Sequence, residues 1–341
     1  STSSYYFSGI DLNTISDVNT SGAQNGYLMT YNSASQIFQF LEPALQNKSV
    51  ADIVDINTTT VNNNDSVYLS FLSIPTILTI ISSLNSNINH YGSERINPKY
   101  TYLPFHWKLL RFLTYRKMNA LIIQTKEIKN EFLNYMPKNK LVIIPNSINK
   151  IIEKNELKKI TSRKIKILFI GRLEFQKGID VVLESIIKIF NSKIKNKFIF
   201  EIVGDGTLSK YVEDTIIKND LSNYVKFIKG TNKPETFMRE SHIILHPSRY
   251  EGMSNVVLEA MSLGKCVISS YKASSEIIIN NKDGILIKEV SSKEIIETLK
   301  KVSLKRELLK EIGLNAIKKI RVNYLEETNH KLWSKTLKLK K

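Results

Sequence analysis

The amino-acid sequence predicts an α/β protein with two domains. From residue 163 onward, short runs rich in β-branched residues alternate with segments of helical periodicity, and this alternation predicts βαβ units around a parallel sheet. A chain of 341 residues is long enough for two domains that each bury a core. With 42% hydrophobic and 24% charged residues, the composition is that of a globular protein.

In the second half of the chain, most of the expected strands lead into a segment whose apolar residues recur at helical spacing. The run RKIKILFIG is apolar and ends on Gly171, and IDVVLESIIKIF has the spacing of a helix. Parallel sheets of this kind present their functional residues at the carboxyl ends of the strands. The expected strands are residues 163–171, 197–206, 225–230, 242–248 and 265–271, and the expected helices are residues 179–190, 208–220, 234–241, 255–264 and 291–303.

The first half of the chain carries weaker patterns. Residues 66–89 form a long stretch without a charged side chain, but polar residues and Pro75 interrupt it. We therefore expect a strand over 67–72 and a helix over 76–84 rather than a membrane span. Residues 149–163 lack a clean apolar face and are the expected linker, so the predicted domains are residues 1–150 and 151–324. Further strands are expected at residues 3–10, 50–56, 119–125 and 140–148.

The net charge of +17 is unevenly distributed. Residues 1–90 carry a net charge of −5, residues 91–150 carry +8, and the remainder carries +14. This excess indicates an anionic partner, and it leaves open whether that partner is a membrane surface, a nucleic acid or a phosphorylated substrate.

The cysteine and histidine content bounds the chemistry further. The single cysteine, Cys266, excludes an internal disulfide framework and a cysteine-based zinc site, and we expect it to be buried. With no signal-peptide pattern at the start, a cytoplasmic protein is expected. Four histidines show no metal-ligand spacing and are expected to be structural, namely His106, His242, His246 and His330.

Three turns that contain glycine follow expected strands. They are GRLEFQKG (171–178), GDG (204–206) and PSRYEGMSN (247–255). The first and third open helices whose free backbone N–H groups are able to receive an anion. Arg172 and Lys177 add positive charge beside the first of these helices, so the turns predict a pocket for a diphosphate.

Two glutamates flank the start of the helix at 255–264. If Ser254 or Asn255 caps this helix, Glu251 lies in the loop before it and Glu259 lies about one turn inside it. Carboxylates accept hydrogen bonds from hydroxyl groups, which sugars supply. The arrangement fits a ligand with a ribose at one end, a hexose at the other and a diphosphate between them.

At these positions the sequence resembles the retaining glycosyltransferases of family 4, which have the two-domain GT-B fold. The resemblance is carried by GRLEFQKGID, VGDGTLSKYVE and HPSRYEGMSNVVLEAMSLGKCVISS, and it covers roughly residues 163–290. Glu251 and Glu259 match the family signature of two glutamates separated by seven residues. SERINPKY (93–100) and LVIIPNSI (141–148) look like pieces of the acceptor half in bacterial polysaccharide members.

The resemblance implies two Rossmann-like domains facing a central cleft, with residues 325–341 crossing back onto the first domain. It also implies a UDP-sugar donor, with Arg172 and Lys177 on the diphosphate, Glu259 on the ribose and Glu251 on the transferred sugar. Glu94 and Arg95 would lie on the acceptor side. Further contacts with the donor are expected from Gly171, Gly204, Asp205, Gly252, Met253, Ser254, Asn255, Val256 and Gly22.

The sequence departs from the family pattern in the first domain. The glycine loop that usually reads Gly-Gly-Ala-Glu is SGAQ here, with Ser21 for the first glycine and Gln24 for the acid, which bears on Gly22 as a phosphate contact. Many members place a histidine near the reacting sugar, and His90 is the nearest candidate. Either His90 or Glu94 takes that place, and His90 is otherwise an ordinary loop histidine.

The implied reaction moves a hexose or N-acetylhexosamine to a glycan acceptor with retention at the anomeric carbon. Cations and N–H groups at the phosphate stabilise the charge of the leaving diphosphate. No metal cofactor is expected, and no Asp-x-Asp motif is present. One alternative is an enzyme of the same fold that resembles UDP-N-acetylglucosamine 2-epimerase. The other is a basic α/β protein that binds nucleic acid, although the basic residues follow no recognised nucleic-acid motif.

The segment 99–118 mixes aromatic and leucine residues with basic residues that include Lys108, Arg111, Arg116 and Lys117. This mixture is expected of a helix on an anionic membrane, and the alternative is a core helix with a charged outer face. On the first reading the acceptor is lipid-linked, plausibly a polyprenyl diphosphate glycan. The protein would then be peripheral at the inner face of the cell membrane.

Overall fold

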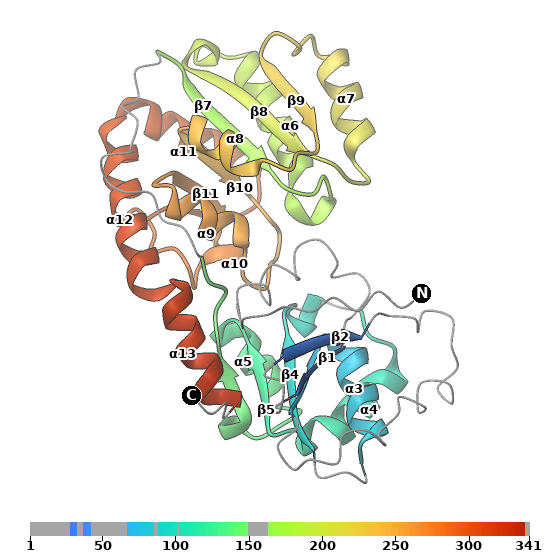
Figure 1. The fold of residues 1–341 in the computed structure, drawn as a ribbon. Helices are drawn as coiled ribbons and strands as arrows, with labels where there is room; N and C mark the ends of the chain where they lie inside the picture. The colour runs from blue at the N-terminus through green and yellow to red at the C-terminus, as the bar shows by residue number, and fades with distance from the viewer. Residues whose placement is uncertain are drawn as a thin grey trace. The chain divides into compact units, whose positions relative to one another are not determined.

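Two α/β units make up the chain, each built around its own sheet (Figure 1). The computed structural model describes residues 28–32, 37–41, 67–84, 88–100, 102–148 and 163–337. Unit 1 comprises residues 1–147 and 326–341, and unit 2 comprises residues 148–325. The boundaries predicted from sequence lie three residues later at the first division and one residue earlier at the second. The strands expected at 3–10 and 50–56, and Gly22 with its loop, lie outside the described residues.

Unit 1 contains a mixed sheet with the strand order β2-β1-β3-β4-β5-β6. β1 pairs antiparallel with β2 and β3, whereas the neighbours from β3 to β6 are parallel. The strands are β1 (Leu28–Asn32), β2 (Ile37–Leu41), β3 (Val67–Phe71), β4 (Asn89–Glu94), β5 (Ala120–Ile123) and β6 (Leu141–Ile143). The helices are α3 (Ser73–Ser82), α4 (Phe105–Thr114), α5 (Lys126–Phe132) and α13 (Glu326–Leu337), with 3-10 turns at Pro98–Tyr100, Tyr115–Lys117 and Lys138–Lys140.

The sheet of unit 1 buries both of its faces. β3 to β6 are adjacent in chain order, so right-handed crossovers place their connecting helices on one face. On that face Leu121 and Ile123 of β5 join a core with residues of α3 and α5. On the other face Ile122 packs in a core with Trp333 and Leu337 of α13. The last described helix therefore completes the core of unit 1, as the predicted crossing-back requires.

Unit 2 contains a fully parallel sheet with the strand order β12-β11-β10-β7-β8-β9. Its strands are β7 (Ile165–Ile170), β8 (Phe198–Gly204), β9 (Val225–Lys229), β10 (Ile243–His246), β11 (Cys266–Ser270) and β12 (Ile285–Ile287). Its helices are α6 (Ile179–Phe190), α7 (Ser209–Lys218), α8 (Pro234–Glu240), α9 (Asn255–Ser262), α10 (Tyr271–Ser274), α11 (Ser292–Leu304) and α12 (Glu307–Asn323), with 3-10 turns at Phe175–Lys177 and Lys195–Lys197.

The central strand β7 contains an unbroken run of apolar residues because both of its faces are buried. Ile167 and Phe169 enter the core on one face, and Leu168 and Ile170 enter the core on the other. Successive side chains of a strand point to opposite faces, so a strand covered on both sides needs an unbroken apolar run. Cys266 is buried in β11 as expected, and burial raises its pKa to about 12.

The structure adds strands that the patterns did not predict. The expected strands after residue 163 are all present, but β12 is an additional short strand at the edge. In unit 1 the segment that contains His90, which we expected to be a loop, forms the buried strand β4. Among the described residues, no helix is both long and apolar enough to cross a membrane.

Candidate functional site

The strand order of unit 2 creates a switch point between β7 and β10. From β7 the chain continues outward through β8 and β9, whereas from β10 it continues in the opposite direction through β11 and β12. In sheets with this order, ligands bind outside the carboxyl ends of the two strands at the reversal. The loops at that edge are 171–178 after β7 and 247–254 after β10. These contain the first and third of the glycine turns predicted from sequence.

Two glycines allow these loops to approach closely. A Cβ on Gly204 would lie 1.9 Å from the carbonyl oxygen of Gly171. Gly178 has a φ of 74°, and a Cβ there would lie 2.3 Å from the carbonyl oxygen of Pro247. Any other residue at either position would force the backbone apart. Gly204 therefore lets the end of β8 approach the loop after β7, and Gly178 lets that loop meet the loop after β10.

Arg249 holds the loop after β10 against the start of α6. Its guanidinium forms two parallel hydrogen bonds with the carboxylate of Asp180, with N···O distances of 2.8 and 2.7 Å. It also lies over the ring of Phe175, 3.6 Å from the centroid. The side-chain amide of Gln176 donates to the carbonyl oxygen of Tyr250 at 3.0 Å. Sequence reasoning missed these residues, because only the meeting of the two loops gives them their partners.

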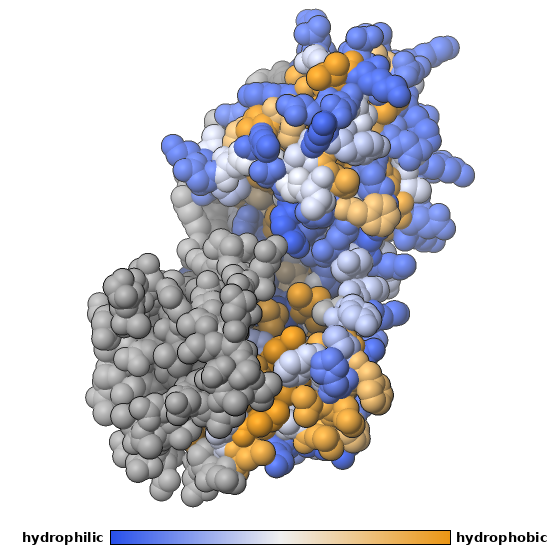
Figure 2. Space-filling model, turned by 90° about the vertical axis from the view of Figure 1, so that its right-hand side faces the viewer, coloured by the Kyte–Doolittle hydropathy of each residue, from blue (hydrophilic) through white to orange (hydrophobic). Residues whose placement is uncertain are grey.

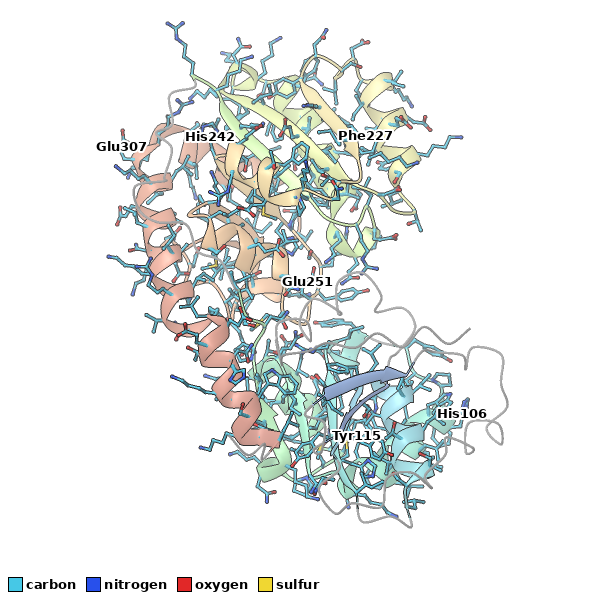
Figure 3. The ribbon with its side chains drawn as sticks, viewed as in Figure 1. His106, Tyr115, Phe227, His242, Glu251 and Glu307 are labelled. Atoms are coloured by element: carbon cyan, nitrogen blue, oxygen red, sulfur yellow. The ribbon has the colours of Figure 1, made fainter. Side chains whose placement is uncertain are left out.

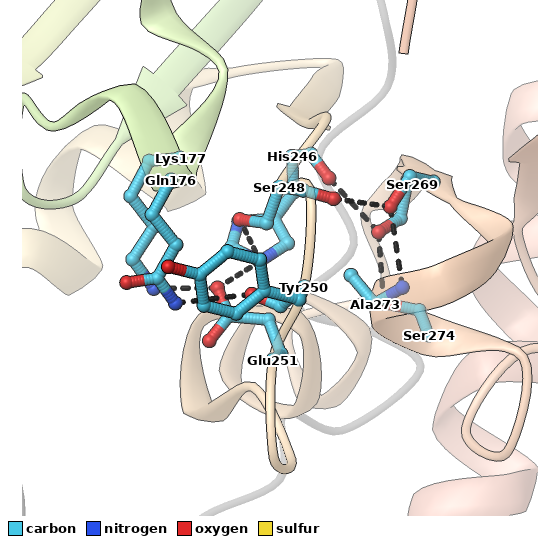
Figure 4. A network of polar contacts seen from close by, with 10 residues as sticks. Gln176, Lys177, His246, Ser248, Tyr250, Glu251, Ser269, Ala273 and Ser274 are labelled. Carbon is cyan, nitrogen blue, oxygen red and sulfur yellow. Dashed lines mark hydrogen bonds and ion pairs between the residues drawn. The ribbon is translucent and has the colours of Figure 1, made fainter. Parts of the chain in front are cut away.

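Lys177 and Glu251 meet at the switch point (Figure 4). Figure 3 labels Glu251 within unit 2. The Nζ atom of Lys177 lies 2.5 Å from Oε1 of Glu251, and the two side chains are only 15% and 10% exposed. The sequence assigned Lys177 to a phosphate and Glu251 to a sugar. The structure adds that they form an ion pair with each other.

His246, the last residue of β10, lies on the other side of Glu251. Its Nε2 is 3.4 Å from Oε1 of Glu251 and 3.2 Å from Oγ of Ser248. The hydroxyl of Ser269 in β11 donates to the carbonyl oxygen of His246 at 2.9 Å, which holds the end of the strand in place. We expected His246 to be merely structural, and the structure instead places it in contact with the candidate catalytic carboxylate. Its position at the end of an apolar strand, directly before Pro247, was the available signal.

The charge states of this cluster follow from its contacts. Burial by itself raises the pKa of Glu251, but hydrogen bonding with His246 and the positive charge of Lys177 outweigh it and lower the pKa to about 2. Burial lowers the pKa of His246. At neutral pH the cluster therefore holds an ionised carboxylate between a lysine ammonium and a neutral imidazole.

The helix α9 begins beside this cluster, as the sequence predicted. Ser254 occupies the N-cap position, although its side chain makes no capping hydrogen bond. Leu258 N–H donates to the carbonyl oxygen of Ser254, so the amides before Leu258 face outward from the helix start. Glu259 is half-buried in the second turn. Three predicted donor contacts at this helix start are half-buried, namely Gly252, Asn255 and Val256. Met253 instead packs into the core.

The remaining residues predicted to contact the donor differ in their solvent exposure and in whether their polar groups already have a hydrogen-bond partner. Arg172 is exposed directly after β7. The N–H of Gly171 donates to the carbonyl oxygen of Val203 at 3.1 Å, so this amide already has a partner. Asp205 is exposed, but its Oδ1 accepts hydrogen bonds from Ser209 Oγ at 2.6 Å and from the Gly206 amide at 2.9 Å. These two hydrogen bonds lower its pKa and place its carboxylate at the start of α7.

In unit 1 the structure separates His90 from the carboxyl edge of the sheet. His90 is the second residue of β4, its ring lies 2.7 Å from Ser83 Oγ, and its backbone N–H donates to Asn119 Oδ1. At about 3.3 Å per residue, it lies about 16 Å along the strand from Arg95. The structure therefore does not support His90 as a catalytic residue, because His90 lies near the start of β4 and ligands bind at the carboxyl ends of the strands in a parallel sheet.

Glu94 ends β4 at the correct edge but faces the helices. Its Oε1 accepts hydrogen bonds from Ser73 Oγ at 2.6 Å and from Tyr115 Oη at 2.5 Å, and Arg111 donates to the same serine. Glu94 is 3% exposed, and burial raises its pKa. Its carboxylate therefore stabilises unit 1 from within, so the structure does not support it as a contact for an acceptor. Arg95 points to the opposite face, towards Phe71 and Asn146.

Among the described residues, no group of three or more histidine, cysteine, aspartate or glutamate side chains is arranged to hold a metal ion.

Comparison with known proteins shows which family the chain resembles. Residues 149–319, half of the chain, match the family described as "Glycosyl transferases group 1". The chain is 30% identical over 249 residues to an uncharacterized glycosyltransferase of Methanocaldococcus jannaschii, covering 72% of this chain and 63% of that protein. It is 27% identical over 173 residues to the capsular polysaccharide biosynthesis glycosyltransferase CapM of Staphylococcus aureus, covering 50% of this chain and 45% of CapM.

Among solved structures, that of HepE from Anabaena in complex with UDP matches with a TM-score of 0.71 at 15% identity, covering 85% of this chain and 81% of HepE. The chain thus spans less than two thirds of the curated relatives described above, but most of this structural neighbour. The two Rossmann-like units have the GT-B fold, as predicted. On this evidence the chain belongs to the glycosyl transferases group 1 family.

Proposed function

We propose that this chain is a retaining glycosyltransferase that moves a hexose or an N-acetylhexosamine from a UDP-sugar to a glycan acceptor in cell-surface polysaccharide biosynthesis. The observation that carries the proposal is the buried pair of Lys177 and Glu251 at the switch point of unit 2. HepE, which resembles this chain in fold, was solved with UDP, and CapM is described as acting in capsular polysaccharide biosynthesis.

The donor's diphosphate fits the positive side of this site. A lysine ammonium has three N–H donors, and Glu251 occupies one direction, so others remain for phosphate oxygens. Arg172 is exposed at the adjacent strand end, and the outward amides of α9 add a positive dipole end. Glu259, half-buried in α9, is the proposed partner for the ribose hydroxyls.

The proposed reaction breaks the bond between the anomeric carbon and the phosphate oxygen. The electron pair of this bond goes to the diphosphate, while the acceptor hydroxyl adds to the same face of the sugar and gives its proton to a donor phosphate oxygen. The pKa of Glu251 is about 2, so its carboxylate is ionised at neutral pH. It therefore accepts hydrogen bonds from the sugar hydroxyls and does not serve as the acid. We propose no metal cofactor, because Arg172, Lys177 and the helix amides carry the role of neutralising the leaving charge.

The exposed face of α4 supports a lipid-linked acceptor and a peripheral position at the inner face of the cell membrane. Phe105 is 80% exposed, and Leu109, Leu113 and Phe112 are between 42% and 56% exposed. Figure 2 shows apolar residues gathered on the surface of unit 1. Exposed basic side chains on the same segment would contact anionic headgroups, namely Lys108, Arg116 and Lys117.

One member of the basic set predicted from sequence is excluded by the structure. Arg111 is 3% exposed and lies within 5.8 Å of the ring centroids of Tyr115, Phe132 and Tyr135. A guanidinium enclosed by three aromatic rings is not available to lipid. The segment 99–118 thus has features of both alternatives, the membrane-surface helix and the core helix with a charged outer face. One face of α4 lies in the core and the other is exposed.

The test is a panel of UDP-sugars and GDP-sugars scored by thermal stabilisation and then incubated with lipid-linked acceptors. A nucleotide at a hundredfold excess over its Kd stabilises a protein by about 2.7 kcal/mol, so UDP and the correct UDP-sugar should raise the Tm of unit 2. Mass spectrometry should show one added sugar, and NMR should show the donor's anomeric configuration.

Other outcomes of this panel would contradict the proposal. Free UDP with an epimerised sugar or 2-acetamidoglucal, formed without an acceptor, would favour the epimerase reading. Absence of stabilisation by any nucleotide, together with DNA affinity that falls steeply with salt, would favour nucleic-acid binding.

A further inference from the structure

Four polar side chains gather at the carboxyl edge of the sheet in unit 1, on the face opposite α3 and α5. Ser93 and Arg95 come from the end of β4, Gln124 follows β5, and Asn146 follows β6. These strands are neighbours in the sheet. All four side chains are at most 8% exposed, so their polar groups have been taken out of water.

Arg95 is the charged member of this cluster, and it has no counter-ion among the residues that the structure describes. Its Nη1 donates to Asn146 Oδ1 at 2.7 Å, and its guanidinium lies 5.8 Å from the ring centroid of Phe71. No carboxylate of the described residues forms an ion pair with it, and burial alone lowers its pKa to about 10. A buried charge without an opposite charge is costly, so this one calls for an anion that binds it.

The unsatisfied atoms of the cluster indicate what that anion carries. Three buried atoms have no hydrogen-bond partner within the described part of the chain, namely Arg95 Nε, Ser93 Oγ and Gln124 Oε1. With Nη1 engaged by Asn146, the free edge of the guanidinium is the one formed by Nε and Nη2, which suits two oxygens of one carboxylate or phosphate. Gln124 Oε1 only accepts hydrogen bonds, so the same ligand must also present a hydroxyl.

We propose that this cluster is a recognition site for an anionic sugar in the acceptor, with Arg95 binding a carboxylate or phosphate oxyanion and Gln124 accepting from a neighbouring hydroxyl. The assignment rests on the proposed glycosyltransferase function and narrows its acceptor class. The two sources of the anion are a uronic acid and a sugar whose anomeric carbon carries a phosphate, as in a diphosphate-linked acceptor.

The experiment uses the full chain saturated with UDP, so that the diphosphate site of unit 2 is already occupied. Three probes are titrated and followed by calorimetry: methyl glucuronide, glucose 1-phosphate and methyl glucoside. We expect one of the two anionic sugars to bind and the neutral methyl glucoside not to bind. Arg95→Gln should weaken that binding at least tenfold and leave UDP affinity unchanged. Lys138→Gln, which removes an exposed basic side chain of the same unit, is the matched control and should bind as the original chain does.

A second measurement does not depend on the folding of a variant. The Nε–Hε resonances of the arginines are recorded in the original chain, with Arg95→Lys used only to assign the signal. Addition of the binding probe should shift the Arg95 resonance and leave that of Arg116 unchanged.

The outcomes separate this inference from the proposed function. If UDP binds but neither anionic sugar does, if Arg95→Gln binds them unchanged, or if the Arg95 resonance does not move, the inference is wrong and the glycosyltransferase proposal stands. If UDP itself does not bind the original chain, the proposed function is wrong, whatever the probes do.

Discussion

Glu251 is largely removed from solvent and yet ionised, and its two polar neighbours explain how. The Lys177 ammonium at 2.5 Å offsets the cost of burying the carboxylate, while His246 occupies the other side of the same oxygen. Removing the carboxylate of Glu251 should affect a different measured quantity from removing that of Glu259.

Glu251→Ala should lower the rate of sugar transfer on the order of a hundredfold, because a group that stabilises the transition state is lost. It should change UDP affinity much less. Glu259→Ala should instead weaken UDP binding by roughly tenfold or more, the value of a hydrogen bond to a charged group. Steady-state kinetics and UDP calorimetry measure the two effects. Glu297→Ala, an exposed glutamate of α11, is the control and should change neither. Equal rates in all three variants would remove the assignment.

The lowered pKa of Glu251 predicts an acid-sensitive contribution to stability. Its pKa falls from 4.5 in the unfolded chain to about 2 in the folded one, so the ionised form stabilises the fold above pH 4.5. This contribution, about 3 kcal/mol at most, is lost as the pH falls from 4.5 towards 2. Urea unfolding between pH 5 and pH 3 should show the free energy of unfolding decline less steeply in Glu251→Gln than in the original chain. Parallel declines would contradict the ion-pair assignment.

At the scale of elements, the site depends on how two loops are fastened together. The first loop ends at Gly178 and leads into α6, and the second contains Arg249. The bidentate contact of Arg249 with Asp180 and its position over Phe175 join the two. Both charged side chains are about a quarter exposed, so solvent screening reduces what the pair contributes.

Arg249→Ala and Asp180→Ala should each destabilise the chain modestly, and together by less than the sum. A double-mutant cycle should give a coupling energy of about 0.5 to 2 kcal/mol. Because the loop carries Glu251, the single variants should also raise the KM for the donor. Strict additivity in urea unfolding would show that the two side chains do not interact in solution.

The helix α4 divides between core and surface, and the division gives a test of membrane binding. Changing Lys108, Arg116 and Lys117 to Glu should weaken binding to vesicles that contain anionic lipid, by about a hundredfold or more, since each basic residue contributes about 1 kcal/mol. The matched control changes three exposed lysines of α11, Lys293, Lys300 and Lys301, to Glu. Sedimentation with vesicles measures both. Equal retention of the two variants would show that charge on α4 does not direct binding.

At the scale of the whole molecule, the two units have separate cores, and α13 belongs to the core of unit 1. The chain should therefore unfold in two steps rather than one. Each step should respond to a different perturbation.

UDP should raise the Tm of the unit 2 transition alone, because the proposed donor site lies in that unit. Trp333→Ala should lower the free energy of unfolding of unit 1 by about 3 to 5 kcal/mol, because the indole of Trp333 is only 3% exposed and packs in the core of that unit. Calorimetry with and without UDP separates the two effects. A single transition that both perturbations shift together would contradict the independence of the units.

Much of the fold of unit 2 could be predicted from sequence because its signals are local. An apolar β-branched run such as IKILFI specifies a doubly covered strand wherever it occurs, and a glycine turn before a helix specifies an anion-binding loop. In unit 1 the local signals were weaker. β4 reads NHYGSE, with too few apolar residues to reveal a buried strand.

The sequence by itself determined the two-domain α/β architecture and the glycine turns of unit 2, because periodicity and spacing are properties of neighbouring residues. The tertiary structure decided which side chains share a site. It paired Lys177 with Glu251 and brought in His246 and Arg249, because the reversal of strand order makes β7 and β10 neighbours. It placed His90, Glu94 and Arg95 at different ends and faces of one strand, because alternation along a strand and its direction within the sheet set where each side chain points.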